Sequence, residues 1–189
     1  IIEYYKAKGP LQILDIGTGS GCIAISLAHY LADASVTAVD MSGEILDTAR
    51  QNASANNCNG NVNFIKGDLR TDTFTGLFDH SFDCVVSNPP YIALNEWPAL
   101  QKEITGHEPR KALCDEADGL SFYPLIAAQT SRLLSSGGTI WVETGDTLAA
   151  PVKDIFAAQG FEEINTFSDL NGIERFVTAV WNKKNEDYD

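Results

Sequence analysis

The fold is decided by Ile13-Leu-Asp-Ile-Gly-Thr-Gly-Ser-Gly21 and by the apolar run Cys22-Ile-Ala-Ile-Ser-Leu-Ala28 that follows it. This order predicts a strand that runs into a glycine loop and then into a helix. Glycines at alternate positions let a loop backbone pass close to a ligand, because they carry no side chain. The sequence therefore predicts the opening unit of an α/β fold with a ligand site in its first loop.

The spacing of the loop glycines and the acid before them indicate the kind of ligand. The pattern is G-x-G-x-G, whereas a dinucleotide site shows G-x-G-x-x-G and reads a pyrophosphate, so a dehydrogenase is excluded. Asp15 argues against an anionic ligand. S-adenosylmethionine fits better, because its sulfonium and amino groups are cationic and it carries no phosphate. The predicted cofactor contacts in this loop are Asp15, Gly17, Thr18, Gly19 and Gly21.

Acidic residues also end the next two predicted strands. Asp40 closes the strand 35–40, at the place where such folds hold a ribose through its two hydroxyls. Asp68 follows the strand 62–66, and we expect it near the adenine amino group. Three acids at consecutive strand ends favour one cofactor site. The predicted contacts outside the glycine loop are Asp40, Met41, Asp68, Leu69 and Asn88.

The acceptor site is predicted at Asn88-Pro89-Pro90-Tyr91, which ends the apolar run Phe82-Asp-Cys-Val-Val-Ser87. The two prolines have no backbone N–H, so the chain leaves the sheet in a stiff turn whose carbonyls stay free to accept hydrogen bonds. The Asn88 side-chain oxygen and the Pro89 carbonyl can hold both hydrogens of an –NH2 group, while Tyr91 offers a flat face. We therefore predict a planar amine or amide substrate, with Asn88, Pro89 and Tyr91 as catalytic residues and Pro90 as a further substrate contact.

Composition limits the partners and the compartment. The 189 residues include 13 Lys and Arg against 26 Asp and Glu, and the net charge of −13 disfavours a nucleic-acid surface. The four cysteines are scattered without a C-x-x-C pattern, so no metal site is predicted, and Cys22 and Cys84 are interpreted as small core residues. With no signal peptide and no long apolar segment, we expect a cytoplasmic protein without a membrane span.

Strand and helix patterns alternate from Leu11 to about Gly160, which is typical of a parallel sheet covered by helices on both faces. Gly137-Gly138 is interpreted as a helix stop, and Ser42 as a helix N-cap. Asn171-Gly172 marks the turn of a hairpin at the sheet edge. The predicted strands are 11–16, 35–40, 62–66, 81–87, 138–144, 161–168 and 175–181, and the predicted helices are 21–32, 42–56, 121–134 and 149–159.

The segment 92–120 has little periodicity and contains several prolines and glycines. A loop of this length inside a compact domain is usually functional or disordered. Because it follows Asn-Pro-Pro-Tyr, we expect a lid that recognises the substrate. The alternative is a solvated insertion with a short helix around residues 98–104.

Four stretches resemble the HemK-type release-factor glutamine methyltransferases, which belong to the class I methyltransferases that use S-adenosylmethionine. The stretches are Asp15-Ile-Gly-Thr-Gly-Ser-Gly21, Asn88-Pro-Pro-Tyr91, Glu108-Pro-Arg-Lys-Ala-Leu113 with Asp118-Gly-Leu120, and Asp169-Leu-Asn-Gly172 with Arg175. The resemblance implies a Rossmann-like, mostly parallel seven-stranded sheet with an antiparallel C-terminal hairpin. It also implies transfer of a methyl group from S-adenosylmethionine, leaving S-adenosylhomocysteine, to the glutamine amide nitrogen in the Gly-Gly-Gln loop of a peptide-chain release factor.

The resemblance covers a single methyltransferase domain over residues 1–189, for which we expect a monomer. Family members usually carry a small N-terminal helical domain that helps to recognise the release factor, and this chain has only about ten residues before its first predicted strand. The chain is therefore expected to be a catalytic domain alone, either part of a longer protein or a short homologue.

Two alternatives remain open at this stage. In a nucleic-acid amino-methyltransferase of the adenine N6 type, the Asn-Pro-Pro-Tyr site would hold a flipped adenine stacked on Tyr91. The net charge and the lack of a basic cluster argue against it. A binding or scaffold protein that keeps the fold without catalysis is disfavoured by the intact Asp15, loop glycines and Asn88.

Overall fold

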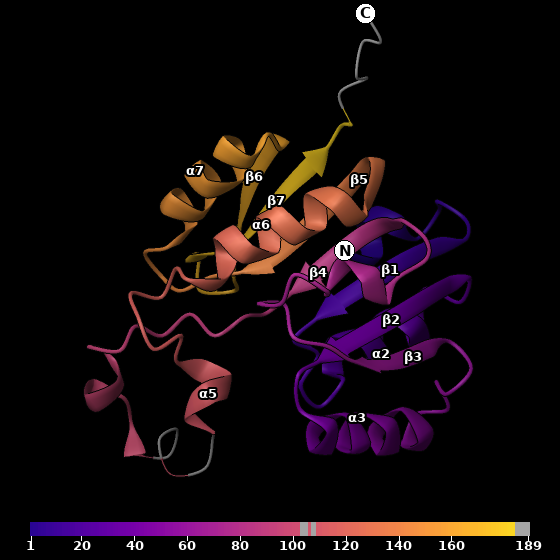
Figure 1. Cartoon of the computed structure of the whole chain (residues 1–189), viewed down its shortest axis with the longest axis horizontal. Helices are drawn as coiled ribbons and strands as arrows, with labels where there is room; N and C mark the ends of the chain where they lie inside the picture. Colours follow the sequence, from indigo (N-terminus) through magenta and orange to yellow (C-terminus); the bar gives the residue numbers. More distant parts are fainter. Residues whose placement is uncertain (103–105, 107–108, 184–189) are drawn as a thin grey trace, which may run out of the picture.

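A seven-stranded sheet in the order β3-β2-β1-β4-β5-β7-β6 forms the centre of the computed structural model, which describes residues 1–102, 106 and 109–183 (Figure 1). The first five strands pair in parallel, whereas β7 runs antiparallel to both β5 and β6. The predicted fold class is confirmed. The strands are β1 (Leu11–Ile16), β2 (Ala34–Asp40), β3 (Val62–Lys66), β4 (Phe82–Ser87), β5 (Leu134–Glu143), β6 (Glu162–Ser168) and β7 (Glu174–Trp181).

Helices cover both faces of the sheet, because successive strand residues point to opposite sides. Ile13 packs in an apolar cluster with residues of α1, α2 and α3, and its neighbour Leu14 packs in a second cluster with residues of α6 and α7. No helix in the described part of the chain is long and apolar enough to cross a membrane. The helices are α1 (Ile2–Tyr5), α2 (Cys22–Tyr30), α3 (Gly43–Ala55), α5 (Arg110–Leu113), α6 (Phe122–Leu133) and α7 (Ala149–Gln159), with 3₁₀ turns η1 (Thr75–Leu77) and η2 (Trp97–Ala99).

The glycine pair Gly137-Gly138 lies inside β5, and its position corrects one predicted boundary. Helix α6 ends at Leu133 and β5 begins at the next residue, so Gly137-Gly138 is not the helix stop and the strand does not start at 138. Leu134 pairs with Phe82 and Thr139 pairs with Cys84, so β5 advances five residues where β4 advances two. The glycines lie in this bulge, where Gly137 has a φ of 80° that other residues rarely adopt.

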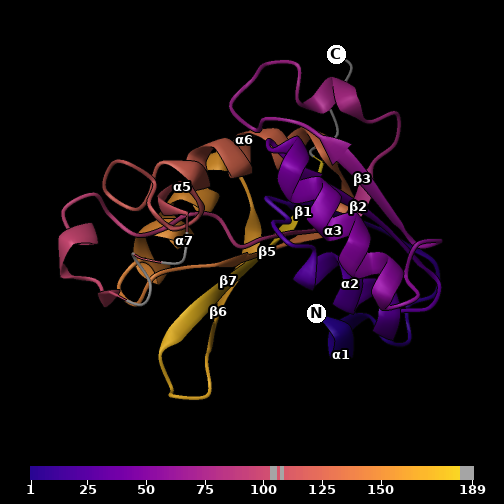
Figure 2. The same ribbon diagram turned by 90° about the horizontal axis from the view of Figure 1, so that it is seen from below.

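Three smaller predictions have clear outcomes. Ser42 caps α3, since its hydroxyl oxygen accepts a hydrogen bond from the Ile45 N–H at 3.4 Å. The interpretation of Cys22 as a core residue is wrong, because its side chain is exposed at the start of α2, whereas Cys84 is buried as expected. The turn at Asn171-Gly172 is confirmed, and the β6–β7 hairpin projects from the body of the fold (Figure 2).

Candidate active site

Three neighbouring strands bring the predicted site residues to one edge of the sheet. Ile16 of β1 lies beside Val39 of β2 on one side and beside Ser87 of β4 on the other. The glycine loop, Asp40 and Asn88 therefore start at the same level of the sheet. The Ser87 hydroxyl ties the two central strands together by donating to the Ile16 carbonyl at 2.8 Å. This carboxyl edge is where ligands bind in open parallel sheets.

The glycine loop turns sharply over the end of β2. The backbone N–H groups of Gly17 and Thr18 both donate to the Val39 carbonyl, at 2.8 and 3.0 Å. Gly17 and Gly19 have positive φ angles, and a Cβ at either position would meet no atom within 4 Å. A Cβ at Gly21 would instead lie 3.2 Å from the Ala49 Cβ. The first two glycines thus leave open space for a ligand, and the third allows α2 and α3 to pack closely.

Asp15 lies at the centre of this arrangement and has no exposed surface. Its Oδ2 accepts hydrogen bonds from the Thr18 hydroxyl at 2.7 Å and from the Ala24 N–H at 3.2 Å. Its Oδ1 is buried and has no partner among the described residues. Burial raises the pKa of Asp15 to about 6, with a smaller contribution from the nearby charge of Asp40. An unfilled acceptor on a buried carboxylate suits a ligand that brings a cation or a hydrogen-bond donor.

Asp40 joins the glycine loop to the start of α3. Its Oδ2 accepts from the Gly19 N–H at 3.1 Å and its Oδ1 accepts from the Ser42 N–H at 2.9 Å. The carboxylate is only partly buried, and each of its oxygens can accept a second hydrogen bond. Its position and remaining acceptors therefore fit a pair of sugar hydroxyls.

Asp68 has a partner that the sequence prediction did not include. Arg70 binds its carboxylate through Nη2 to Oδ2 at 2.7 Å and through Nε to Oδ1 at 2.9 Å. These hydrogen bonds lower the pKa of Asp68, so the group stays ionised. The Arg70 Nη2 also lies 3.6 Å from the Sδ of the exposed Met41, while Leu69 is buried. Met41, Asp68 and Arg70 therefore form one contact group beside the ends of β2 and β3.

The Asn-Pro-Pro-Tyr turn borders a small hollow of about 70 Å³ that is completed by Ala112 and Leu113 of α5. Asn88 is exposed, Pro89 is buried, and Pro90 and Tyr91 are partly buried. A volume of this size takes a few water molecules or one small planar group. The helix α5 comes from the third stretch of the family resemblance, so two of the four stretches meet at this hollow.

Tyr91 is restrained by a residue that the prediction missed. Its hydroxyl donates to the Glu143 Oε1 at 3.1 Å. Burial raises the pKa of Tyr91 to about 12, and the charge of Glu143 acts in the same direction. Glu143 ends β5 just as Asp40 ends β2, so the rule that selected the other acids could have found it. At neutral pH the Tyr91 hydroxyl is therefore a hydrogen-bond donor and not a base.

The described ends of the segment 92–120 are bonded to each other. The Ile92 N–H donates to the Leu113 carbonyl at 2.9 Å, and the Leu94 N–H donates to the Ala117 carbonyl at 2.9 Å. Asp115 fixes the backbone of the residues that lead into α6, since its Oδ2 accepts hydrogen bonds from the N–H groups of Gly119 and Ser121. Of the predicted helix 98–104, the described part shows the 3₁₀ turn η2 (Trp97–Ala99) at its start, and Leu100 is extended. Residues 103–105 and 107–108 lie outside the described part, so the lid stays a prediction.

The fourth stretch of the resemblance builds the hairpin turn beside this edge. The Asp169 Oδ1 accepts from the N–H groups of Asn171 and Ile173, and its Oδ2 lies 3.5 Å from the Arg175 Nε. Arg175 also forms an ion pair with Asp146, which follows the end of β5. These contacts give Asp169 and Arg175 a structural role in joining the hairpin to the loop after β5.

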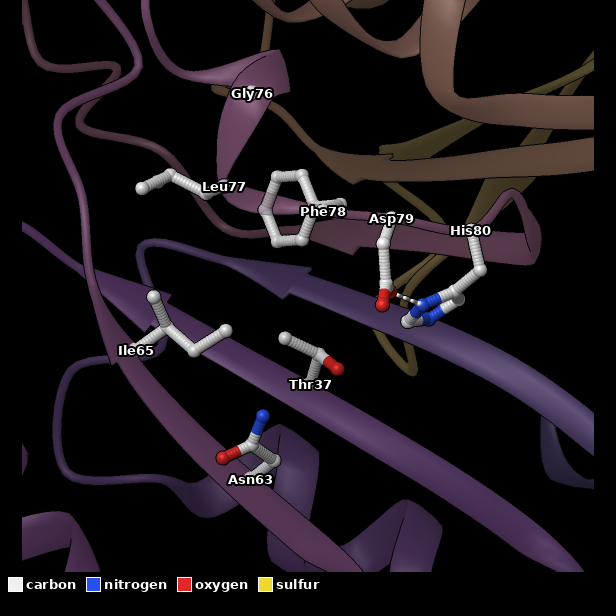
Figure 3. Close-up of a pocket in the computed structure, with 8 residues that line it drawn as sticks. All are labelled: Thr37, Asn63, Ile65, Gly76, Leu77, Phe78, Asp79 and His80. Carbon is white, nitrogen blue, oxygen red and sulfur yellow. Dashed lines mark hydrogen bonds and ion pairs between the residues drawn. The ribbon is translucent and has the colours of Figure 1, made fainter.

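A larger hollow of about 280 Å³ lies elsewhere, over the middle of β2 and β3. Figure 3 shows Phe78 above Thr37, with the hydrogen-bonded pair of Asp79 and His80 to one side. None of the predicted site residues lines it. Its position away from the carboxyl ends of the strands separates it from the candidate site.

Comparisons with known proteins bear on both the fold and the site. Residues 13–107 match a family described as a methyltransferase domain. The chain is 40% identical over 169 residues to a release factor glutamine methyltransferase of Chlorobaculum tepidum, covering 89% of this chain and 57% of that protein. It is 42% identical over 179 residues to the protein of the same name from Geobacter sulfurreducens, covering 94% and 61%. The chain thus spans about three-fifths of the length of these relatives.

Two solved structures show the same fold at low sequence identity. A methyltransferase of Pyrococcus furiosus has a TM-score of 0.69 at 20% identity, with 95% of this chain and 80% of that chain covered. TrmN of Thermus thermophilus has a TM-score of 0.65 at 20% identity, with 95% and 46% covered. The named relatives confirm the resemblance that the four stretches indicated, and the matched family covers the glycine loop and the Asn-Pro-Pro-Tyr turn. The chain belongs to the methyltransferase domain family.

Proposed function

We propose that this chain binds S-adenosylmethionine at the glycine loop and methylates the side-chain amide nitrogen of a glutamine in a peptide-chain release factor. The observation that carries the proposal is the placement of Asn88-Pro-Pro-Tyr91 at the end of β4, directly beside the loop that follows β1. An acceptor for a planar –NH2 group and a loop suited to a cationic cofactor therefore share one edge of the sheet. The names of the relatives favour a release factor as the substrate.

The residues present fit S-adenosylmethionine. The unfilled Oδ1 of Asp15 suits a cationic or N–H-bearing group, and the open space at Gly17 and Gly19 admits a ligand close to the backbone. We assign the ribose hydroxyls to Asp40, and the adenine end to Asp68 with its neighbours Met41 and Leu69. Thr18 keeps Asp15 in place through their hydrogen bond. Bound there, the cofactor would supply an electrophilic methyl group.

The acceptor residues would orient a poor nucleophile. The lone pair of an amide nitrogen is conjugated with its carbonyl, so it reacts only in a restricted geometry. Asn88 and the Pro89 carbonyl would accept the two N–H hydrogens, and Tyr91 and Pro90 would hold the amide plane. Fixed geometry can lower the activation free energy by about 7–11 kcal/mol, whereas each hydrogen bond to the substrate can lower it by about 1–3 kcal/mol. Positioning is therefore the larger effect.

The test is a methyl-transfer assay with S-adenosylmethionine in which a release factor and unmethylated duplex DNA are offered in parallel. Peptide and nucleoside mass spectrometry would locate the added methyl group. A methyl group on the glutamine amide of the Gly-Gly-Gln loop is the expected result, and its rate of formation should fall about 100-fold in Asn88→Ala. Methylation of adenine instead would replace this proposal by the nucleic-acid enzyme, which the net charge of −13 disfavours.

A further inference from the structure

Glu143 and Tyr91 are 52 positions apart in the sequence, yet the Tyr91 hydroxyl donates to the Glu143 Oε1 at 3.1 Å. The sheet brings them together, since Ser87 of β4 lies beside Val142 of β5. Tyr91 lies in the loop after β4, whereas Glu143 is the last residue of β5, an inner strand of the sheet. The hydrogen bond therefore ties the outer end of the Tyr91 side chain to the rigid sheet.

The backbone of Glu143 is itself held from both sides. The hydroxyl of the fully buried Tyr123 donates to the Glu143 carbonyl at 2.9 Å. On the other side Glu143 lies opposite Phe176 of β7, and the next N–H, that of Thr144, donates to the Arg175 carbonyl at 2.8 Å. The Glu143 carboxylate thus extends from a fixed point, and only its own side-chain rotations remain free.

Two glycines allow other segments to approach Tyr91 closely. A Cβ at Gly145 would lie 3.5 Å from the Tyr91 Cδ2, and a Cβ at Gly119 would lie 2.6 Å from the Tyr91 carbonyl oxygen. Gly119 also has a φ of +87°, and its N–H donates to Asp115 at 2.8 Å. The ring edge and the hydroxyl of Tyr91 are therefore restrained by the end of β5 and the residues just after it, and its main-chain carbonyl is restrained by the segment at Gly119.

We propose that Glu143 is a positioning residue, whose carboxylate holds the Tyr91 ring in the orientation needed to support the substrate amide. Glu143 is not one of the described residues that line the hollow at Asn88. It therefore acts through Tyr91. The inference rests on the proposed function. It requires a hydrogen-bond acceptor at position 143 and assigns no contact between Glu143 and the substrate.

The kinetic test uses Glu143→Ala, Glu143→Gln, Tyr91→Phe and the double variant Tyr91→Phe/Glu143→Ala with a release factor as substrate. We expect Glu143→Ala to lower kcat about 5- to 20-fold, the range of one lost hydrogen bond, with little change in KM for S-adenosylmethionine. Glu143→Gln keeps an acceptor and should restore kcat to within about 3-fold of the wild type. Tyr91→Phe should lower kcat by the same factor as Glu143→Ala. The double variant should lower kcat no further than either single variant does.

The matched control is Glu174→Ala, which removes a carboxylate from β7 that is bonded to the Thr166 hydroxyl and not to Tyr91. It should leave kcat within about 2-fold of the wild type. A double variant whose loss is the product of the two single losses would overturn the inference. A loss in Glu143→Ala no larger than that in Glu174→Ala would overturn it as well.

A second measurement separates this inference from the proposed function, because it needs no substrate. In protein labelled with ¹³C at the tyrosine Cζ, the Tyr91 resonance reports the hydrogen bond of its hydroxyl. We expect it to move in Glu143→Ala, to move little in Glu143→Gln, and to stay in place in Glu174→Ala. An unchanged resonance in Glu143→Ala would refute the contact. A wild-type chain that methylates no release factor would instead refute the proposed function and leave the hydrogen bond between Tyr91 and Glu143 in place.

Discussion

The buried carboxylate of Asp15 should lower the free energy of unfolding at neutral pH, and we expect Asp15→Asn to remove that cost. Burial raises the pKa of Asp15 from 3.8 to about 6, a difference of about 2.2. A carboxyl group with a higher pKa in the folded state binds its proton more tightly there, so stability falls as the pH rises from 3.8 towards 6. Above pH 6 the full effect is about 3 kcal/mol.

Urea denaturation of the cofactor-free protein at two pH values tests this expectation. Asp15→Asn should raise the free energy of unfolding by as much as about 3 kcal/mol at pH 7.5 and by about half of that at pH 5, where the folded wild type already holds most of the proton. Asp47→Asn is the matched control, because Asp47 is exposed and paired with Arg50. It should change the stability by less than about 0.5 kcal/mol at both pH values.

The same variant should lose affinity for S-adenosylmethionine as it gains stability. An amide has no negative charge to offer a cationic group, and we expect at least about a tenfold rise in Kd by calorimetry, equivalent to about 1.4 kcal/mol. A variant that is less stable than the wild type at pH 7.5, or equally stabilised at both pH values, would refute burial of the charge as the cause. An unchanged Kd would remove Asp15 from the cofactor site.

The remaining predictions concern the acceptor, the ribose and the loop. Asn88→Ala should lower kcat by about 100-fold and leave the Kd for S-adenosylmethionine within about 3-fold of the wild-type value, because the lost contact is to the substrate amide. Losses of similar size in kcat and in cofactor affinity would contradict this role. Asp40→Ala should raise that Kd at least about tenfold by calorimetry, and an unchanged value would exclude Asp40 from the site. Gly21→Ala should cost about 1–3 kcal/mol in urea denaturation, since its φ is +86° and the new Cβ would crowd Ala49, whereas Gly60→Ala, which meets no atom within 4 Å, should cost much less.

Local patterns predicted the seven strands and the helices α2, α3, α6 and α7, but they did not predict α1, α5 or the role of Glu143 at the end of β5. The glycine loop, Asp40 and the Asn-Pro-Pro-Tyr turn each follow an apolar strand, and parallel pairing then places strand ends at one edge. The exposed position of Cys22 and the bulge at Gly137-Gly138 were missed because both depend on how the element packs against its neighbours. A continuous run of apolar residues does not indicate which face of a helix is buried.

The side-chain pairs at the site depend on tertiary structure in the same way. Arg70 is only two residues from Asp68, but whether its guanidinium binds that carboxylate or points into solvent depends on the conformation of the turn after β3. The contact between Glu143 and Tyr91 requires β5 to lie next to β4, which is a property of the sheet order. The sequence therefore predicted which residues reach the edge and did not predict which residues restrain them there.

The position of β7 between β5 and β6 has a consequence for synthesis of the chain. The last of the described strands, Glu174–Trp181, is an inner strand of the sheet, so β5 has an unpaired edge until those residues leave the ribosome. Such an edge can pair with other chains. During translation the glycine loop and the Asn-Pro-Pro-Tyr turn emerge long before β7, and the exposed edge of β5 must be kept from pairing with other chains until β7 is available.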